Sequence, residues 1–193
     1  MKLTLASFII FNLIIGCKNQ DKKIIDIPND LVLIQDSVIT INTESKEVKF
    51  EGTPSLEEGI TEFKYLGYNP RIEFHAVSAS FWEETEVYLI DNKTAKTTTI
   101  WNFPTYSPND SLIACLSQEY GLEGIPNGFQ VWKLSANRTL TKIEELDQKE
   151  WVPRELIWLD NSTIQLKITP VQQFYENGMP SDKIFINKVF KIN

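Results

Sequence analysis

The stretch Val87–Leu134 decides the fold. It reads V-Y-L-I-D-N-K-T-A-K-T-T-T-I-W, N-F-P-T-Y-S-P-N-D-S, L-I-A-C-L-S-Q-E-Y, then a Gly/Pro loop at residues 121–128, then F-Q-V-W-K-L. Runs of β-branched and aromatic residues alternate here with Asp-Asn, Pro-Asn-Asp and Pro-Asn-Gly. Short polar side chains and glycine accept the backbone angles of tight turns, and the apolar runs between them suit strands. The pattern predicts consecutive antiparallel strands joined by short turns.

The same pattern continues on both sides of this stretch. The segment Arg71–Trp82 alternates with a period of two, which places Phe74 and Ala76 on one face and His75 and Val77 on the other. Further apolar or alternating runs occupy residues 31–34, 38–41, 48–50, 60–65 and 183–193.

One window leaves the choice between helix and strand open. Leu140–Trp151 has enough apolar spacing for one or two helical turns, and a strand followed by an acidic loop fits it equally well. The rest of the chain has no comparable helical stripe. The sequence therefore predicts an all-β fold, an antiparallel meander of short strands.

Two internal repeats support a recurring unit. Tyr106–Ala114 lines up with Ile157–Gln165 at an offset of 51 residues, and Val87–Asp91 lines up with Gln130–Leu134 at an offset of 43. Both offsets are close to the roughly 40 to 50 residues of a four-stranded propeller blade. The repeats predict blade-like sheets that follow one another along the chain.

The repeated unit resembles the blades of bacterial propellers of the Tol-associated and WD-repeat-like kind. The residues that carry the resemblance are Y-L-I-D-N-K-T and P-T-Y-S-P-N-D-S-L-I-A, within Thr85–Lys167, and the second copy has Trp158-Leu159 where Ser-Pro would stand. A closed propeller needs at least about four blades, and this chain is too short for four complete ones. The resemblance implies a partial propeller or a β-sandwich.

The amino terminus has the features of a secretory signal. Lys2 is followed by an apolar run that ends at Gly16, and this run is shorter than the roughly 20 residues of a membrane-spanning helix. L-I-I-G-C at residues 13–17 resembles the lipobox of bacterial lipoproteins, and the N-F-P…S-P…Q-V-W layout resembles uncharacterised lipoproteins of that kind. The resemblance implies that Cys17 is acylated and becomes the first residue of the mature protein.

These features divide the chain into three parts. Residues 1–16 are expected to be a lipoprotein signal peptide, residues 17–29 a polar tether and residues 30–193 a single β domain. Two or three acyl chains hold a protein on a bilayer far more firmly than one. We therefore expect the lipid bilayer to be a partner through acylated Cys17. The location implied is the bacterial cell envelope, with the outer membrane favoured.

The composition argues against several classes of activity. The formal net charge is −7, which disfavours nucleic acid as a partner. His75 is the single histidine, and Cys115 is the one thiol besides Cys17, so a zinc site is not expected. His75 reads as a structural or half-exposed histidine and Cys115 as a small core residue. No cofactor or metal is predicted.

Aromatic residues at strand ends are the candidate contact surface. Trp101, Phe103, Tyr106 and Tyr120 lie in or beside the predicted loops 102–110 and 119–127, where rings anchor protein or glycan partners. Packing of these rings between sheets is the alternative. The function predicted is non-enzymatic binding or assembly in the envelope, with an envelope protein or a glycan as partner. Two alternatives stay open: a glycan or peptide hydrolase that uses paired carboxylates, and an inhibitor or immunity-type lipoprotein.

Overall fold

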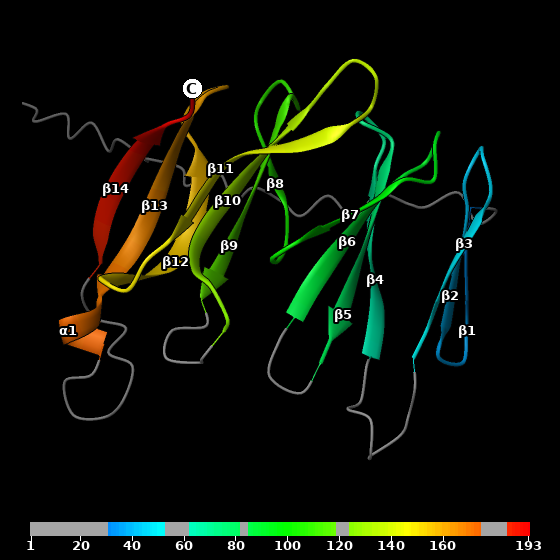
Figure 1. Cartoon of the computed structure of the whole chain (residues 1–193), viewed down its shortest axis with the longest axis horizontal. Coiled ribbons are helices and arrows are strands. Elements are labelled where there is room, and N and C mark those ends of the chain that lie inside the picture. The colour runs from blue at the N-terminus through cyan, green and yellow to red at the C-terminus, as the bar shows by residue number, and fades with distance from the viewer. Residues whose placement is uncertain (1–30, 53–61, 82–84, 119–123, 175–184) are drawn as a thin grey trace, which may run out of the picture.

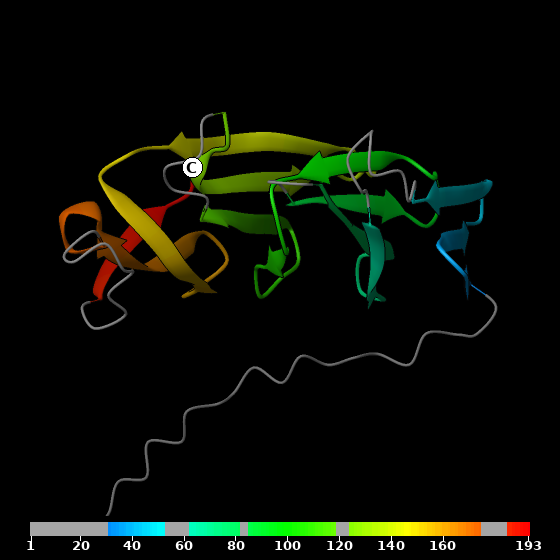
Figure 2. The same ribbon diagram turned by 90° about the horizontal axis from the view of Figure 1, so that it is seen from below.

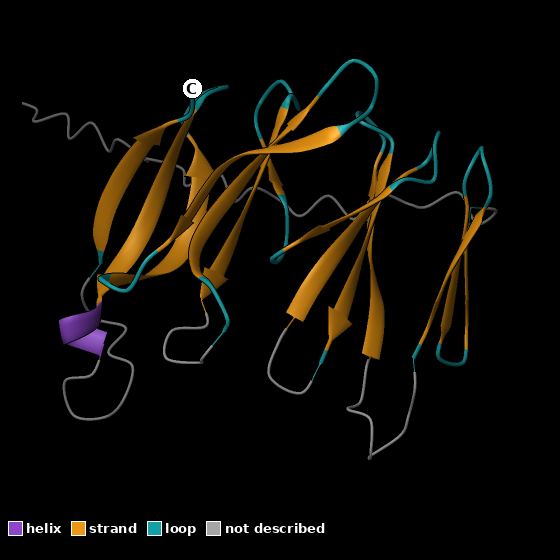
Figure 3. Cartoon of the chain, viewed as in Figure 1, coloured by secondary structure: helices purple, strands orange, loops and turns teal. Residues whose placement is uncertain are grey.

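The computed structural model describes residues 31–52, 62–81, 85–118, 124–174 and 185–193. The predicted signal peptide, residues 1–16, and the predicted tether, residues 17–29, lie outside the described residues. The regular elements of the described part are strands and one short helix, α1 (Val171–Phe174), as Figure 3 shows. Every strand pairing is antiparallel. The prediction of an all-β antiparallel meander is confirmed.

The strands form four sheets in chain order. The first sheet contains β1 (Val32–Gln35), β2 (Val38–Asn42) and β3 (Glu47–Glu51). The second contains β4 (Glu62–Asn69), β5 (Phe74–Ser80), β6 (Thr85–Asp91) and β7 (Thr97–Ile100). The third contains β8 (Thr105–Tyr106), β9 (Leu112–Gln118), β10 (Asn127–Leu134) and β11 (Leu140–Asp147). The fourth contains β12 (Trp151–Trp158), β13 (Thr163–Pro170) and β14 (Ile186–Lys191).

The four sheets lie side by side in one row. Figure 1 shows the first sheet at one end of the row and the fourth at the other, and Figure 2 shows the same order from below. Each sheet is a meander, because neighbouring strands are consecutive in the chain. The described residues therefore form an open row of blade-like sheets, and its two ends lie far apart.

Apolar residues fill the space between successive sheets. Ile41 and Val77 belong to the cluster between the first and second sheets, and Leu89 and Ile113 to the cluster between the second and third. Phe129 packs with residues of the fourth sheet. Each middle sheet is thus covered on both faces. For this reason β5 is buried from Phe74 to Ala79, on both of the faces that the alternation separates.

The predicted repeats are visible in the turns. The offset of 51 relates the β8–β9 hairpin to the β12–β13 hairpin. In the first, Asn109 Oδ1 accepts a hydrogen bond from Ser111 N at 3.2 Å, and in the second Asp160 Oδ1 accepts one from Ser162 N at 2.7 Å. The offset of 43 relates β6 to β10, each the third strand of its sheet. Such side-chain bonds to the backbone two residues on are typical of Asn and Asp in turns.

The segment Leu140–Trp151, for which the sequence allowed either a helix or a strand, is a strand in its first part. β11 spans Leu140–Asp147 and pairs with β10 along its length, with a bulge between Val131 and Trp132. Pairing with β10 gives this segment backbone hydrogen bonds that an isolated helical turn lacks.

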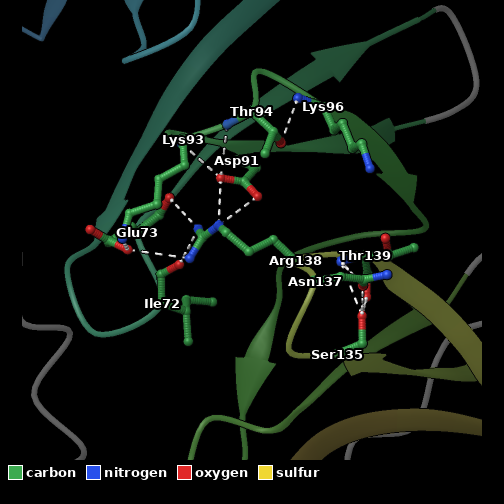
Figure 4. Close-up of polar contacts among 10 residues, drawn as sticks. All are labelled: Ile72, Glu73, Asp91, Lys93, Thr94, Lys96, Ser135, Asn137, Arg138 and Thr139. Atoms are coloured by element: carbon green, nitrogen blue, oxygen red, sulfur yellow. Dashed lines mark hydrogen bonds and ion pairs between the residues drawn. The ribbon is translucent and has the colours of Figure 1, made fainter.

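Arg138 joins the third sheet to the second (Figure 4). It lies in the β10–β11 turn, and its Nε donates to both carboxylate oxygens of Asp91, at 2.9 and 2.8 Å. Its Nη2 donates to the Ile72 carbonyl at 2.8 Å, and its Nη1 lies 3.2 Å from Glu73 Oε2. Burial alone would raise the pKa of Asp91, but the bonds from Arg138 and from Lys93 N outweigh it, so this pKa lies below its usual value. The cluster holds the two sheets in a fixed relative position.

Candidate functional site

A pocket of about 230 Å³ lies between the second and third sheets. It lies where β6 begins and where β7 and β9 end. Asp91 and its partner Arg138 lie at the other end of β6. The described residues that line it come from both sheets and from the loop before β10: Thr85, Glu86, Thr99, Ile100, Trp101, Asn102, Ser117, Ile125, Pro126, Gln130, Trp132 and Lys142. A concave site with aromatic walls and a few polar groups is the usual form of a ligand pocket.

Strand alternation decides which of these side chains face the pocket. Val87 and Leu89 pack toward the third sheet, and Thr85 lies on the same face of β6. Glu86 lies on the opposite face, where its Oε2 accepts a hydrogen bond from the Tyr88 hydroxyl at 3.1 Å. Thr99 pairs with Tyr88 and shares that opposite face. The carboxylate of Glu86 therefore points away from the pocket.

Gln130 organises the site. Its side chain is buried, with 4% of its surface exposed. Its Oε1 accepts hydrogen bonds from Trp132 Nε1 at 3.2 Å and from Trp101 N at 3.3 Å, and its Nε2 donates to Glu145 Oε2 at 2.8 Å. One amide thus holds the indole of Trp132 and the backbone of Trp101 in place. A buried polar group with these partners is satisfied and rigid.

Lys142 and Glu145 form an ion pair beside the pocket. Lys142 Nζ donates to Glu145 Oε2, the same oxygen that Gln130 contacts, and it lies 5.9 Å from the centroid of the Trp132 ring. The hydrogen bond from Lys142 is the largest cause that lowers the pKa of Glu145, and the bond from Gln130 adds to it. Glu145 is therefore ionised at neutral pH.

The structure describes three of the four predicted aromatic contact residues and places them in different surroundings. Trp101 lines the pocket, and Phe103 is exposed beside it, with 54% of its surface accessible. Tyr106 packs against the core between the second and third sheets, and burial raises its pKa to about 12. The alternative prediction of packing between sheets therefore describes Tyr106, and Trp101 also packs against this core beside the pocket. Tyr120 lies outside the described residues.

Sequence reasoning missed the rest of the site. The alternating run F-Q-V-W-K-L favours a core position for Trp132, and this residue does pack against the core, but it also lines the pocket. Gln130 and Lys142 gave no signal, because an amide or a lysine in an alternating strand reads as a solvated residue. Only the pairing of β10 with β11, and the neighbouring second sheet, bring these side chains together.

Neither the single histidine nor the free thiol is among the described residues that line this pocket. His75 is buried, with Nδ1 2.9 Å from the Tyr65 hydroxyl and Nε2 3.2 Å from Asn92 Oδ1, and burial lowers its pKa. Cys115 is 1% exposed, and burial raises its pKa to about 11. The predictions of a structural histidine and a core cysteine are confirmed. Within the described ranges, no three His, Cys, Asp or Glu side chains converge as a metal site.

The sequence has adjacent glutamates that a hydrolase with paired carboxylates could use. Glu57-Glu58 and Glu83-Glu84 lie outside the described residues, and Glu145 is bonded to Lys142.

In the part of the chain that the structure describes, no helix has the length and apolar character that crossing a bilayer requires. Comparison with protein families, with curated proteins and with solved structures finds no match for the chain.

Proposed function

We propose that this chain is a lipid-anchored protein of the bacterial cell envelope that acts by binding, without catalysis, and that a small ligand occupies the pocket between the second and third sheets. The single observation that carries the proposal is the pair of tryptophans at this pocket, Trp101 and Trp132, where the buried amide of Gln130 holds the indole of Trp132 and the backbone N–H of Trp101. A ring that is fixed before binding, as that of Trp132 is, loses little freedom when a ligand arrives.

The connections between the sheets support a preformed pocket. The walls of the pocket belong to two different sheets, so its shape depends on how these sheets are held. Arg138 spans the interface through Asp91 and the Ile72 carbonyl, and Arg71 Nη2 contacts Asp110 Oδ1 at 2.8 Å. Both contacts join the second sheet to the third. The pocket is therefore expected to have the same shape with and without ligand.

The protonation state of Glu145 supports binding over hydrolysis. A glycosidase needs a carboxylic acid of raised pKa and a second carboxylate roughly 5 to 10 Å away. Glu145 has a lowered pKa, and the carboxylate of Glu86 lies on the other face of its sheet. The carboxylates described at this pocket therefore do not have the arrangement that acid–base hydrolysis uses.

The anchor is the second part of the proposal and rests on the lipobox resemblance at Cys17. Acyl chains on this cysteine fasten the mature chain to the membrane, and the polar residues 17–29 span up to about 40 Å when extended. This distance lets the β domain reach a ligand beyond the lipid headgroups. The proposal therefore describes a binding domain held near a membrane surface.

Two matched pairs of variants test the two parts of the proposal. For the anchor, wild-type chain and the Cys115→Ala variant are expected in the detergent phase of a membrane extract, and the Cys17→Ala variant in the aqueous phase. For the pocket, ligand-observed NMR with a library of small polar molecules is expected to give hits that the Thr85→Trp variant loses. Thr97→Trp, an exposed change on the other face of the second sheet, is the control. Hits that Thr85→Trp retains would place the site elsewhere.

A further inference from the structure

The walls of the pocket combine flat apolar rings with short polar side chains. The Trp132 N–H is committed to Gln130, which leaves the carbon atoms of its indole to meet a ligand, beside Lys142 Nζ at 5.9 Å from the ring centroid. Trp101 supplies a second indole, and Ile125 and Pro126 supply apolar edge. Such walls suit a ligand with a flat or gently puckered apolar face, because indoles bind by burying area against such faces.

The polar groups around these rings match hydroxyl groups. Thr85 and Ser117 offer hydroxyls, which both donate and accept, and Asn102 offers an amide. A ligand hydroxyl also donates and accepts, so it forms hydrogen bonds with each of these groups without the need for a charge. A purely apolar ligand would instead cover these polar groups and leave them without partners, which costs about 1–3 kcal/mol for each buried group.

The charges at the pocket balance one another. Lys142 is the cation among the described lining side chains, and it is paired with Glu145. A phosphate or carboxylate ligand would have to compete with Glu145 for Lys142 and would approach a chain whose net charge is −7. A cationic ligand would be repelled by the ammonium group of Lys142. A neutral ligand neither competes with Glu145 nor is repelled by Lys142.

The size of the pocket limits the ligand to a single ring. Its volume of about 230 Å³ is below the roughly 300–1,000 Å³ of pockets for drug-sized ligands. An extended oligomer would not fit inside it, whereas the end of a chain or a free monomer would.

From these observations we propose that the pocket binds one neutral sugar ring, with the C–H face of the ring on the indoles of Trp101 and Trp132 and its hydroxyls on Thr85, Ser117 and Asn102. This inference rests on the proposed function, because it names the ligand class of that same site. In the envelope, the ligand is a free sugar or the terminal sugar of a glycan.

The test uses the full mature chain in a polyoxyethylene detergent, since glucoside or maltoside detergents present sugars themselves. The probes are methyl glucoside, methyl galactoside and N-acetylglucosamine as neutral sugars, glucuronate as the anionic counterpart, and phenol as an aromatic ligand without a sugar ring. Binding is followed by saturation-transfer NMR and by tryptophan fluorescence. Wild-type protein, Thr85→Trp and the control Thr97→Trp are compared, and Trp132→Phe tests the indole while keeping an aromatic ring in the core.

At least one neutral sugar is expected to bind saturably with one site per chain, and glucuronate at least tenfold more weakly. Thr85→Trp should abolish this binding and Thr97→Trp should leave it unchanged, while Trp132→Phe should weaken it severalfold. If glucuronate binds as tightly as methyl glucoside, or if no neutral sugar saturates, the saccharide inference is overturned. Phenol binding that Thr85→Trp abolishes, without sugar binding, also overturns it but retains the pocket as a binding site. If no member of the polar library binds either, the proposed function fails with it.

Discussion

The strongest structural prediction concerns Arg138, which we expect to contribute more to stability than any exposed ion pair. The change is Arg138→Met, which keeps the aliphatic stem of the side chain and removes the guanidinium. Asp91 is fully buried in the native protein, and this change takes away the cation that contacts both of its oxygens. Removing one partner of a buried ion pair typically costs 3–5 kcal/mol, because the other charge is left uncompensated.

The structure reduces that figure for Arg138. The Asp91 carboxylate keeps its bonds from Lys93 N at 2.8 Å and Thr94 N at 3.4 Å, and the Arg138 side chain is 21% exposed. We therefore expect a loss of about 2–3 kcal/mol in the free energy of unfolding. For a domain of this size, 1 kcal/mol corresponds to roughly 2–4 °C in Tm, so the melting temperature should fall by about 5–10 °C.

Arg71→Met is the matched control, since Arg71 also joins the second sheet to the third. The side chain of Arg71 is 63% exposed and that of its partner Asp110 is 11% exposed, so solvent screens the cation of this pair and we expect it to contribute at most about 1 kcal/mol. Urea unfolding followed by tryptophan fluorescence measures both variants. A loss for Arg138→Met no larger than that for Arg71→Met would refute the reasoning.

The pH dependence of the difference adds a second check. Asp91 has a lowered pKa in the folded wild-type protein. Its ionised carboxylate therefore stabilises the fold at pH values above its unfolded pKa of about 3.8, and this stabilisation is lost as pH falls through the folded pKa. In Arg138→Met the carboxylate has no cation beside it, and protonation relieves the cost of its burial. The difference in stability between the two proteins should therefore shrink toward acid pH. A difference that stays constant from pH 7 to pH 3 would mean that the charge of Asp91 is not its source.

Three further predictions follow from other buried groups. Burial lowers the pKa of His75 below 6.5, so as pH falls this residue takes up a proton in the unfolded chain before it does so in the folded one. The free energy of unfolding in urea should therefore be lower at pH 5.5 than at pH 7.5, by up to about 1.4 kcal/mol for this group. His75→Gln should remove that part of the difference. A Cβ at Gly128 would lie 1.8 Å from the Leu146 carbonyl oxygen, so Gly128→Ala should cost about 1–3 kcal/mol by thermal unfolding, and an unchanged Tm would contradict this close approach. Burial raises the pKa of Cys115 to about 11. Titration with a thiol reagent should therefore find no fast-reacting thiol in the folded, acylated chain and one thiol per chain in denaturant. A second thiol in denaturant would mean that Cys17 is not acylated.

Much of the fold follows from local signals in the chain. The turns of Val87–Leu134 and the alternation around them predict strands that the structure contains, because each such turn is built by its own residues. The Asn109 and Asp160 bonds to the backbone two residues on are examples. The offsets of 43 and 51 carry more distant information, since they identify strands with the same place in successive sheets.

The parts that the sequence did not predict depend on contacts between distant segments. Leu140–Trp151 has no decisive pattern, and pairing with β10 makes its first part a strand. Arg138 lies in a polar turn that reads as solvated, and its partner Asp91 is 47 residues away. At the pocket, Trp101 could be selected from its position at a strand end, whereas Gln130 acquires its role only when its amide reaches Trp101 N and Glu145.

The most direct test of the account is a crystal structure of the full mature chain soaked with the tightest neutral sugar of the panel. The account predicts one sugar ring between the second and third sheets, with its C–H face against Trp132 and a hydroxyl within hydrogen-bond distance of Thr85 or Ser117. Sugar density at another surface, with this pocket unoccupied at saturating ligand, would contradict it.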